Sequence, residues 1–172
     1  SYQGLFNAVQ KGTGLEGTIE FFPEEGKYHY DGHRKCGVCL SPKEAEKYQG
    51  ICPVCGKKLT MGVDHRILQL SDREEGAFAM PESGRPYESL VPLPEVISAC
   101  VGFSTASKKV QRQYEMLLEN LGAEFQILRE VPIEDIGLTG GDVLAEGIRR
   151  LRKGEVIRKP GFDGEYGKIE LF

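Results

Sequence analysis

The spacing of apolar residues predicts helices in the second half of the chain. Before Gly122, apolar residues recur three or four positions apart and therefore share one helical face: Val110, Tyr114, Leu117, Leu118 and Leu121. Ser104, Thr105 or Ser107 can cap the start of this helix, and Gly122 ends it. Another helix is expected from Pro94 to Gly102. A third follows Thr139, ends at Gly154 and buries Leu144, Ile148 and Leu151.

The first half of the chain contains residue patterns that predict both strands and helices. Residues 18–22 and 27–30 resemble the two strands of a hairpin joined by the turn residues 23–26. Residues 42–48 predict a short helix, because a serine precedes a proline and a glutamate that complete a capping box. A further helical segment is expected from the spacing of Val63, Ile67 and Leu70.

The tail and the middle of the chain complete the predicted organisation. An Asp-Gly turn signal at 163–164 lies between apolar runs, which predicts a terminal hairpin with Pro160 on an edge strand. Glycines and prolines gather at 76–86, which we interpret as a linker. The expected modules are therefore residues 1–75 and 87–172.

Composition narrows the class of protein. Of the 172 residues, 40% are hydrophobic and 28% are charged, which excludes a disordered or low-complexity chain. No stretch approaches the roughly 20 consecutive apolar residues that span a bilayer, and no targeting segment is evident. We therefore expect a cytoplasmic protein without a membrane partner. A net charge of −4 leaves nucleic-acid binding to local patches.

The cysteines carry the sharpest chemical signal. Cys36 and Cys39 form one C-x-x-C pair, and Cys52 and Cys55 form a second pair twelve residues later. This spacing predicts a closed, tetrahedral four-cysteine site with one structural zinc ion. Two disulfides are the alternative, but a cytoplasmic chain with an odd fifth cysteine, Cys100, fits them poorly. We interpret Cys100 as a buried small apolar residue.

A second cluster of candidate ligands precedes the cysteines. Strand alternation would place His29, Asp31 and His33 on one face, where they could form a secondary metal site or even the centre of a small hydrolase. Alternatively, Asp31 and Gly32 form a turn that breaks the alternation and leaves both histidines without a common role.

Basic residues gather near the end of the chain. They lie beside two aromatic residues, and this combination is typical of surfaces that bind single-stranded or locally unpaired DNA: Arg149, Arg150, Arg152, Lys153, Arg158, Lys159, Phe162 and Tyr166. The alternative is that the cations complement the helix dipole and pair with neighbouring glutamates.

Three segments carry a resemblance to a known family. The sequences YHYDGHRKCGV within 17–38, GICPVCGK at 50–57 and PGFDGEYGKI at 160–169 resemble the endonuclease Q family. That family joins a metal-dependent PHP phosphoesterase domain to a zinc ribbon and a C-terminal helical domain. The resemblance implies an α+β chain, in which residues 1–75 contain the end of the PHP-type domain and a zinc ribbon module, and residues 87–172 form a small helical domain with a terminal hairpin.

The resemblance also implies an activity for the whole enzyme and a non-catalytic role for this chain. It implies a DNA-repair endonuclease, a hydrolase that nicks DNA 5′ of deaminated bases such as uracil or hypoxanthine. Most PHP ligands of the family lie upstream of the matching segments, so we expect this chain to be the C-terminal part that positions damaged DNA for a catalytic domain it lacks. No catalytic residue is assigned. The alternative is a structural or protein-interaction zinc module of a helicase-like or other DNA-processing protein.

Overall fold

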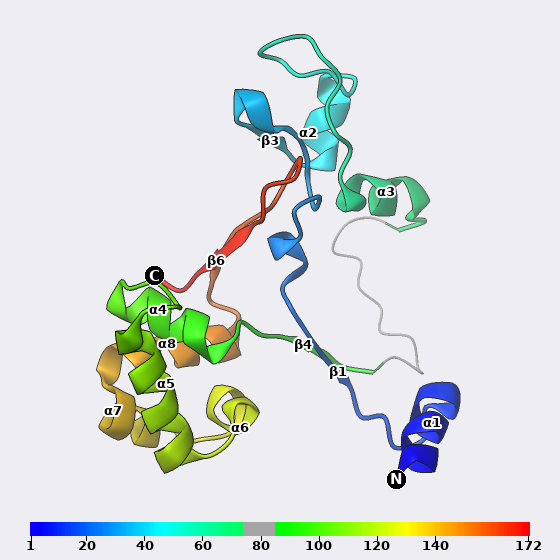
Figure 1. Cartoon of the computed structure of the whole chain (residues 1–172). Helices are drawn as coiled ribbons and strands as arrows, with labels where there is room; N and C mark the ends of the chain where they lie inside the picture. The colour runs from blue at the N-terminus through cyan, green and yellow to red at the C-terminus, as the bar shows by residue number, and fades with distance from the viewer. Residues whose placement is uncertain (74–84) are drawn as a thin grey trace.

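The structure is a computed structural model that describes residues 1–73 and 85–172. Figure 1 shows a bundle of helices, a separate region of short strands and helices, and extended segments between them. Helix α1 (Tyr2–Lys11) stands apart near the N-terminus. None of the described helices has the length and apolar character needed to cross a membrane.

The helical bundle forms the larger core. It contains α4 (Leu93–Val101), α5 (Lys108–Leu121), α6 (Glu124–Arg129), α7 (Ile133–Gly140) and α8 (Asp142–Lys153). The apolar stripes predicted for α5 and α8 face this core, in which these side chains are almost fully buried: Val110, Leu117, Leu144, Ile148 and Leu151. The Ser107 hydroxyl accepts the Val110 N–H and begins α5 as expected.

The bundle also differs from the sequence prediction. Helices α6 and α7 were not predicted, and Thr139 lies inside α7 instead of preceding the last helix. Gly141 separates α7 from α8 in an extended conformation with a positive φ of 91°. A residue with a side chain rarely adopts this conformation, so the glycine allows two helices to follow each other directly. Cys100 is half-buried beside the core, close to its predicted place.

The smaller region contains a second, minor core. It comprises β2 (Asp31–His33), the 3-10 turn η2 (Arg34–Cys36), β3 (Val38–Leu40), α2 (Pro42–Lys47) and α3 (Val63–Leu70). We call this region the ribbon. The Glu44 carboxylate accepts hydrogen bonds from the backbone N–H and the hydroxyl of Ser41, which confirms the predicted capping box. Only Ala45, Cys52 and Leu59 are buried in this core among the described residues.

The predicted hairpin between residues 18–22 and 27–30 is wrong. Strand β1 (Thr18–Glu20) pairs in parallel with β4 (Tyr87–Ser89), a segment far away in sequence. The turn residues form η1 (Pro23–Glu25), and the next strand begins only at Asp31. A strand takes the partner that the tertiary fold brings alongside it, and alternation in the sequence does not identify that partner.

The terminal hairpin is confirmed and connects the two cores. Strands β5 (Ile157–Lys159) and β6 (Lys168–Glu170) pair antiparallel and run from the bundle towards the ribbon (Figure 1). At its tip, the Gly161 carbonyl accepts the Tyr30 N–H at 3.0 Å. The Phe162 ring lies so close to Gly32 that a β-carbon on this glycine would overlap with it.

These findings confirm an α+β chain with a cysteine-containing ribbon, helices and a terminal hairpin. Residues 76–84 of the expected linker lie outside the described residues, and Pro86 directly precedes β4. The division into modules 1–75 and 87–172 therefore stays a prediction.

Candidate metal centre and nucleic-acid surface

Four side chains of the ribbon converge on one point. One potential ligand atom from each of His33, Cys36, Cys52 and Cys55 lies within 4.8 Å of the other three. His33 ends β2 and Cys36 ends η2, while Cys52 and Cys55 come from the loop between α2 and α3. The cluster therefore ties together two chain segments that share little apolar core.

Both segments use the same backbone turn. Gly37 follows Cys36 with φ 64°, and Gly56 follows Cys55 with φ 72°, so each turn closes on a glycine in the left-handed region. The first turn reads H-x-x-C-G and the second reads C-x-x-C-G. In this alignment, His33 is the counterpart of Cys52.

The predicted ligand Cys39 lies outside this group. It is in strand β3 opposite Gly32, and its sulfur faces the Pro160 carbonyl oxygen at 3.9 Å. Burial, together with the negative charges of Glu44 and Asp31, raises the pKa of Cys39 to about 11. The position of its sulfur therefore separates Cys39 from the cluster, whereas its pKa does not, because the pKa of Cys36 is also raised to about 11.

The donor set fits a zinc ion. A tetrahedral zinc site with bonds of about 2.3 Å to sulfur and about 2.0–2.1 Å to nitrogen separates the two donors by about 3.6 Å. The Nδ1 atom of His33 lies 3.5 Å from the sulfur of Cys55. Three thiolates and one imidazole would fill all four positions, so the ion would have a structural role.

The electrostatics of the cluster also favour a cation. Burial, followed by hydrogen bonds with the Cys55 and Cys52 thiols, raises the pKa of Cys36 to about 11. Burial opposes ionisation of Cys52 too, but N–H groups of Cys55 and Val54 leave the pKa of Cys52 below its usual value. The main-chain N–H groups thus favour ionisation of Cys52, and a positive ion beside the cluster would favour ionisation of all three thiols.

The structure separates the three residues of the predicted secondary site. Asp31 is 1% exposed, and its carboxylate contacts the His65 ring at 2.6 Å and accepts the Gly62 N–H at 2.6 Å. His29 stacks on the neighbouring Tyr30 ring, and His33 belongs to the cysteine cluster. The alternative turn at Asp31 does not form either, because this residue is in strand β2.

Sequence reasoning missed two roles in the ribbon. His65 had no assigned role, although its contact with Asp31 attaches α3 to β2. His33 was assigned to the wrong set of neighbours. Both turns, H-x-x-C-G and C-x-x-C-G, end in a cysteine followed by a glycine. This shared pattern is the sequence signal that could have identified His33 as a ligand.

Most of the predicted basic cluster is engaged within the protein. Arg149 pairs with Glu146 at 2.7 Å and with Glu155 at 2.9 Å, and Arg150 also pairs with Glu146 at 2.7 Å. These guanidinium groups hold the pKa of Glu146 at about 2. This arrangement matches the alternative in which the cations pair with neighbouring glutamates.

Arg152 bonds to main-chain carbonyl groups, in contrast to the carboxylate partners of Arg149 and Arg150. Its guanidinium donates to the carbonyls of Ile127 and Leu128, both at 2.9 Å, and of Val131 at 2.7 Å. Burial lowers the pKa of Arg152, and the charge of Glu88 opposes this effect. The side chain therefore closes the C-terminal end of α6.

The remaining predicted contacts are distributed over several surfaces. Lys153 is exposed on α8. Arg158 pairs with Glu24 at 2.9 Å, and Lys159 pairs with Glu170 across the hairpin. The two predicted aromatic contacts lie beside the ribbon, because Phe162 packs on Gly32 and Tyr166 is near Lys27.

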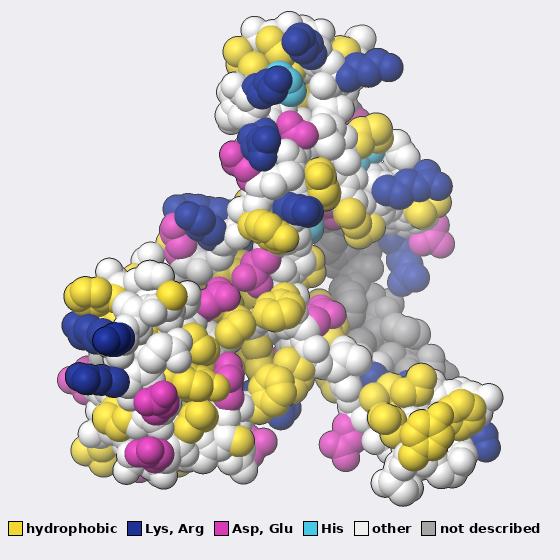
Figure 2. Space-filling model, in the orientation of Figure 1, with side chains coloured by type: hydrophobic (Ala, Val, Ile, Leu, Met, Phe, Trp, Pro, Cys, Tyr) yellow, Lys and Arg dark blue, Asp and Glu magenta, His cyan; other side chains and the backbone are white. Residues whose placement is uncertain are grey.

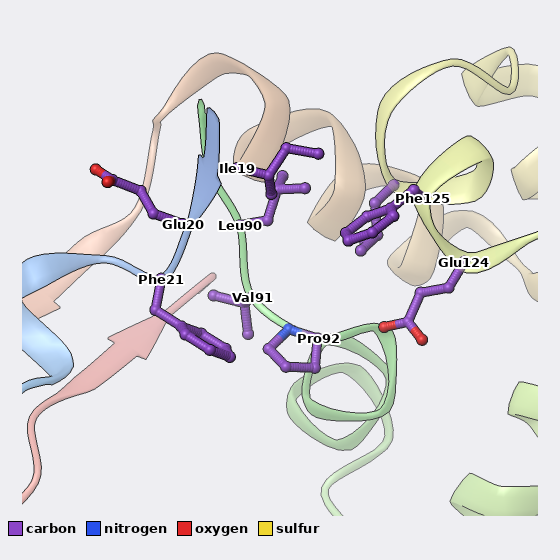
Figure 3. A pocket seen from close by; sticks show the side chains of 9 residues that line it. Ile19, Glu20, Phe21, Leu90, Val91, Pro92, Glu124 and Phe125 are labelled. Carbon is purple, nitrogen blue, oxygen red and sulfur yellow. The ribbon is translucent and has the colours of Figure 1, made fainter. Parts of the chain in front are cut away.

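One apolar pocket lies away from the ribbon (Figure 3). It has a volume of about 300 Å³ and opens between β1 and α6, with the rings of Phe21 and Phe125 on opposite sides. The carboxylate of Glu124 in its wall is already bonded to the Leu93 N–H and the Tyr114 hydroxyl. An apolar wall with carboxylates at its rim does not suit a polyanion.

The sequence of the chain matches a family model and a known protein. Residues 92–155 match the family model described as the MJ0043 C-terminal domain. The chain is 37% identical over 149 residues to protein MJ0043 of Methanocaldococcus jannaschii, and this match covers 87% of the chain but 18% of that protein.

Two solved structures are similar over most of the chain. The lesion-specific endonuclease PfuEndoQ of Pyrococcus furiosus has a TM-score of 0.76 and 32% identity, covering 88% of this chain and 37% of the other. A complex of endonuclease Q with a 27-mer duplex, with an abasic lesion at the active site, has a TM-score of 0.81 and 31% identity. That match covers 99% of this chain and 42% of the solved one. The resemblance indicated by the sequence is thus confirmed: the chain is similar to endonuclease Q, and it spans less than half the length of the solved proteins.

Proposed function

We propose that this chain is the zinc-binding and DNA-binding part of a DNA-repair endonuclease that nicks DNA 5′ of deaminated bases. The observation that carries the proposal is the match of 99% of the chain to endonuclease Q in complex with lesion-containing duplex DNA. This similarity supports a relationship to lesion-specific DNA endonucleases. The deaminated-base substrate and the 5′ position of the nick are the finer parts of the proposal.

In this proposal the chain positions the DNA, and a separate PHP domain hydrolyses the phosphodiester bond. A zinc ion held by His33, Cys36, Cys52 and Cys55 cross-links the two turns of the ribbon. The terminal hairpin then fixes the ribbon, because Asp163 accepts the Thr60 hydroxyl at 2.6 Å and the Arg34 N–H at 2.7 Å. A ribbon held in this way can present DNA to a catalytic centre in a defined orientation.

The proposal is tested by binding of the zinc-loaded chain to labelled duplexes. One duplex carries a single uracil, a second carries hypoxanthine, a third carries an abasic site and a fourth is undamaged. We expect binding that weakens with salt, since phosphate contacts release counterions. We also expect no strand nicking by the chain when magnesium or manganese is added. Absence of DNA binding at low salt would refute the proposal.

A second candidate function is a structural or protein-interaction module. The ion pairs of Arg149 and Arg150 favour it, because they remove cations that the DNA hypothesis needed. This function predicts a protein partner whose complex survives high salt, together with no salt-dependent DNA binding. The four duplexes and a pull-down at high salt therefore separate the two functions.

A further inference from the structure

The ribbon carries cations that its own acidic residues do not balance. Arg34 and Lys35 directly precede Cys36, while Lys57 and Lys58 follow Gly56, and all four side chains are exposed. We call these four residues the ribbon tip. The surrounding segments 32–43 and 50–63 contain no aspartate or glutamate. In Figure 2, Lys and Arg side chains accordingly gather at this end of the molecule.

The ribbon tip differs from the basic cluster on α8 in its pairing. Among the residues that the structure describes, Lys35, Lys57 and Lys58 have no carboxylate within ion-pair distance, whereas Arg149 and Arg150 share Glu146. The nearest acidic group in the hairpin, Asp163, is bound to the backbone N–H of Arg34 and to Thr60. Glu165 is the other hairpin carboxylate near the ribbon, and it is exposed.

The metal centre does not account for these charges. A zinc ion with three thiolates and a neutral imidazole has a net charge of −1, in contrast to −2 for four thiolates. One cation would balance the centre and Asp163 lies beside Arg34, so two of the four cations of the ribbon tip remain in surplus. The surplus leaves a positive surface that attracts a polyanion.

Aromatic rings extend this surface along the hairpin. The Lys27 ammonium lies 5.7 Å from the centre of the Tyr28 ring and 5.6 Å from the centre of the Tyr166 ring. A β-carbon built on Gly164 would be 3.7 Å from the Tyr28 hydroxyl and 3.8 Å from the Arg34 guanidinium, so the Tyr28 ring and the ribbon tip both lie beside this glycine. Tyr166 is 72% exposed despite its contact with Lys27, which leaves most of its ring surface open to a base.

We propose that the ribbon tip binds the phosphate backbone of DNA and that Tyr166 contacts an exposed base beside it. This inference rests on the proposed function, and it moves the DNA contacts from α8 to the ribbon. Lysine ammonium groups without carboxylate partners can contact phosphate at no loss of an existing ion pair. The paired arginines of α8 would have to break such pairs first.

The test compares two variants of the full chain that lose the same charge. One variant carries Lys35→Gln, Lys57→Gln and Lys58→Gln. The matched control carries Lys108→Gln, Lys109→Gln and Arg112→Gln, three exposed cations on α5. Zinc content and thermal unfolding are measured for both, so that loss of the fold is recognised. Affinity for the uracil-containing duplex is then measured over a range of salt concentrations.

We expect the ribbon variant to bind about tenfold or more weakly, and the slope of log K against log salt to decrease in magnitude by about 2.7 for three lost phosphate contacts. The α5 control should keep the wild-type slope. A wild-type slope for the ribbon variant, or an equal loss in both variants, would overturn the inference while the proposed function stands. If the wild-type chain binds none of the duplexes, the proposed function fails and this inference fails with it.

Discussion

Arg152 offers a quantitative test of the structure, because the sequence alone left open whether this residue contacts DNA or has a structural role. Its guanidinium donates three hydrogen bonds to main-chain carbonyls at the end of α6. Ile127 and Leu128 belong to the last turn of that helix, where carbonyls have no partner within the helix. Substitution of Arg152 by alanine would leave these acceptors unsatisfied in a partly buried place.

The expected loss follows from these contacts. A hydrogen bond to a charged group contributes about 1.5–3 kcal/mol. Two of the three bonds share one nitrogen of Arg152, and water can reach part of the site, so we expect about 3 kcal/mol in total for Arg152→Ala. For a chain of this size, this corresponds to a decrease in Tm of about 6–12 °C.

Thermal unfolding followed by circular dichroism at the helical band measures this loss. Lys153→Ala is the matched control, because Lys153 is the next residue and carries the same charge, but its side chain is exposed. We expect the control to change the unfolding free energy by less than about 0.5 kcal/mol. Arg152→Lys should recover only a minor part, since lysine lacks the planar fork. Equal melting of the alanine variants, with weaker DNA binding only for Arg152→Ala, would refute the structural role.

Three further predictions concern the ribbon and its contact with the hairpin. Elemental analysis during chelation should show that His33→Ala loses zinc far more readily than wild type, while Cys39→Ala retains one ion; the reverse order would restore the four-cysteine set. Hydrogen bonds from Thr60 and Arg34 lower the pKa of Asp163, so its stabilising effect is present above the unfolded pKa of about 3.8 and is lost as pH falls through the lower folded pKa. Melting curves of Asp163→Asn should therefore show a weaker loss of stability in acid than wild type, and identical acid profiles would contradict this. Gly32→Ala should destabilise the protein by about 1–3 kcal/mol in urea unfolding, because the new β-carbon would meet both the Phe162 ring and a backbone carbonyl; a neutral effect would show that the hairpin tip does not pack there.

The helices of the bundle could largely be predicted because their signals are local. Helix α5 begins at a serine cap, ends at Gly122 and has its apolar residues on one face. Helix α8 likewise buries the predicted stripe. Helix α6 has only six residues, too few for a periodic pattern to stand out, and it was therefore missed.

The ribbon was predicted only in part because its ligands depend on backbone geometry. The C-x-x-C spacing correctly indicated a cluster that could hold a metal ion, and three of its cysteines converge in the structure. Spacing could not show that Cys39 is in a strand and faces the hairpin, or that His33 ends the preceding strand at the start of the turn. Side-chain direction in a strand depends on register, which the tertiary fold sets.

The sequence by itself determined the periodic helices, the glycine-terminated turns, the cysteine-rich site and the resemblance to endonuclease Q, because each depends on residues close together in the chain. Only the tertiary structure decided that β1 pairs with β4, that the hairpin tip packs on the ribbon and that the three arginines of α8 are engaged within the protein. Such contacts include one between Arg34 and Asp163, which are 129 positions apart in the sequence. Their free energies depend on which surfaces the completed fold brings together, and no local pattern of residues encodes that choice.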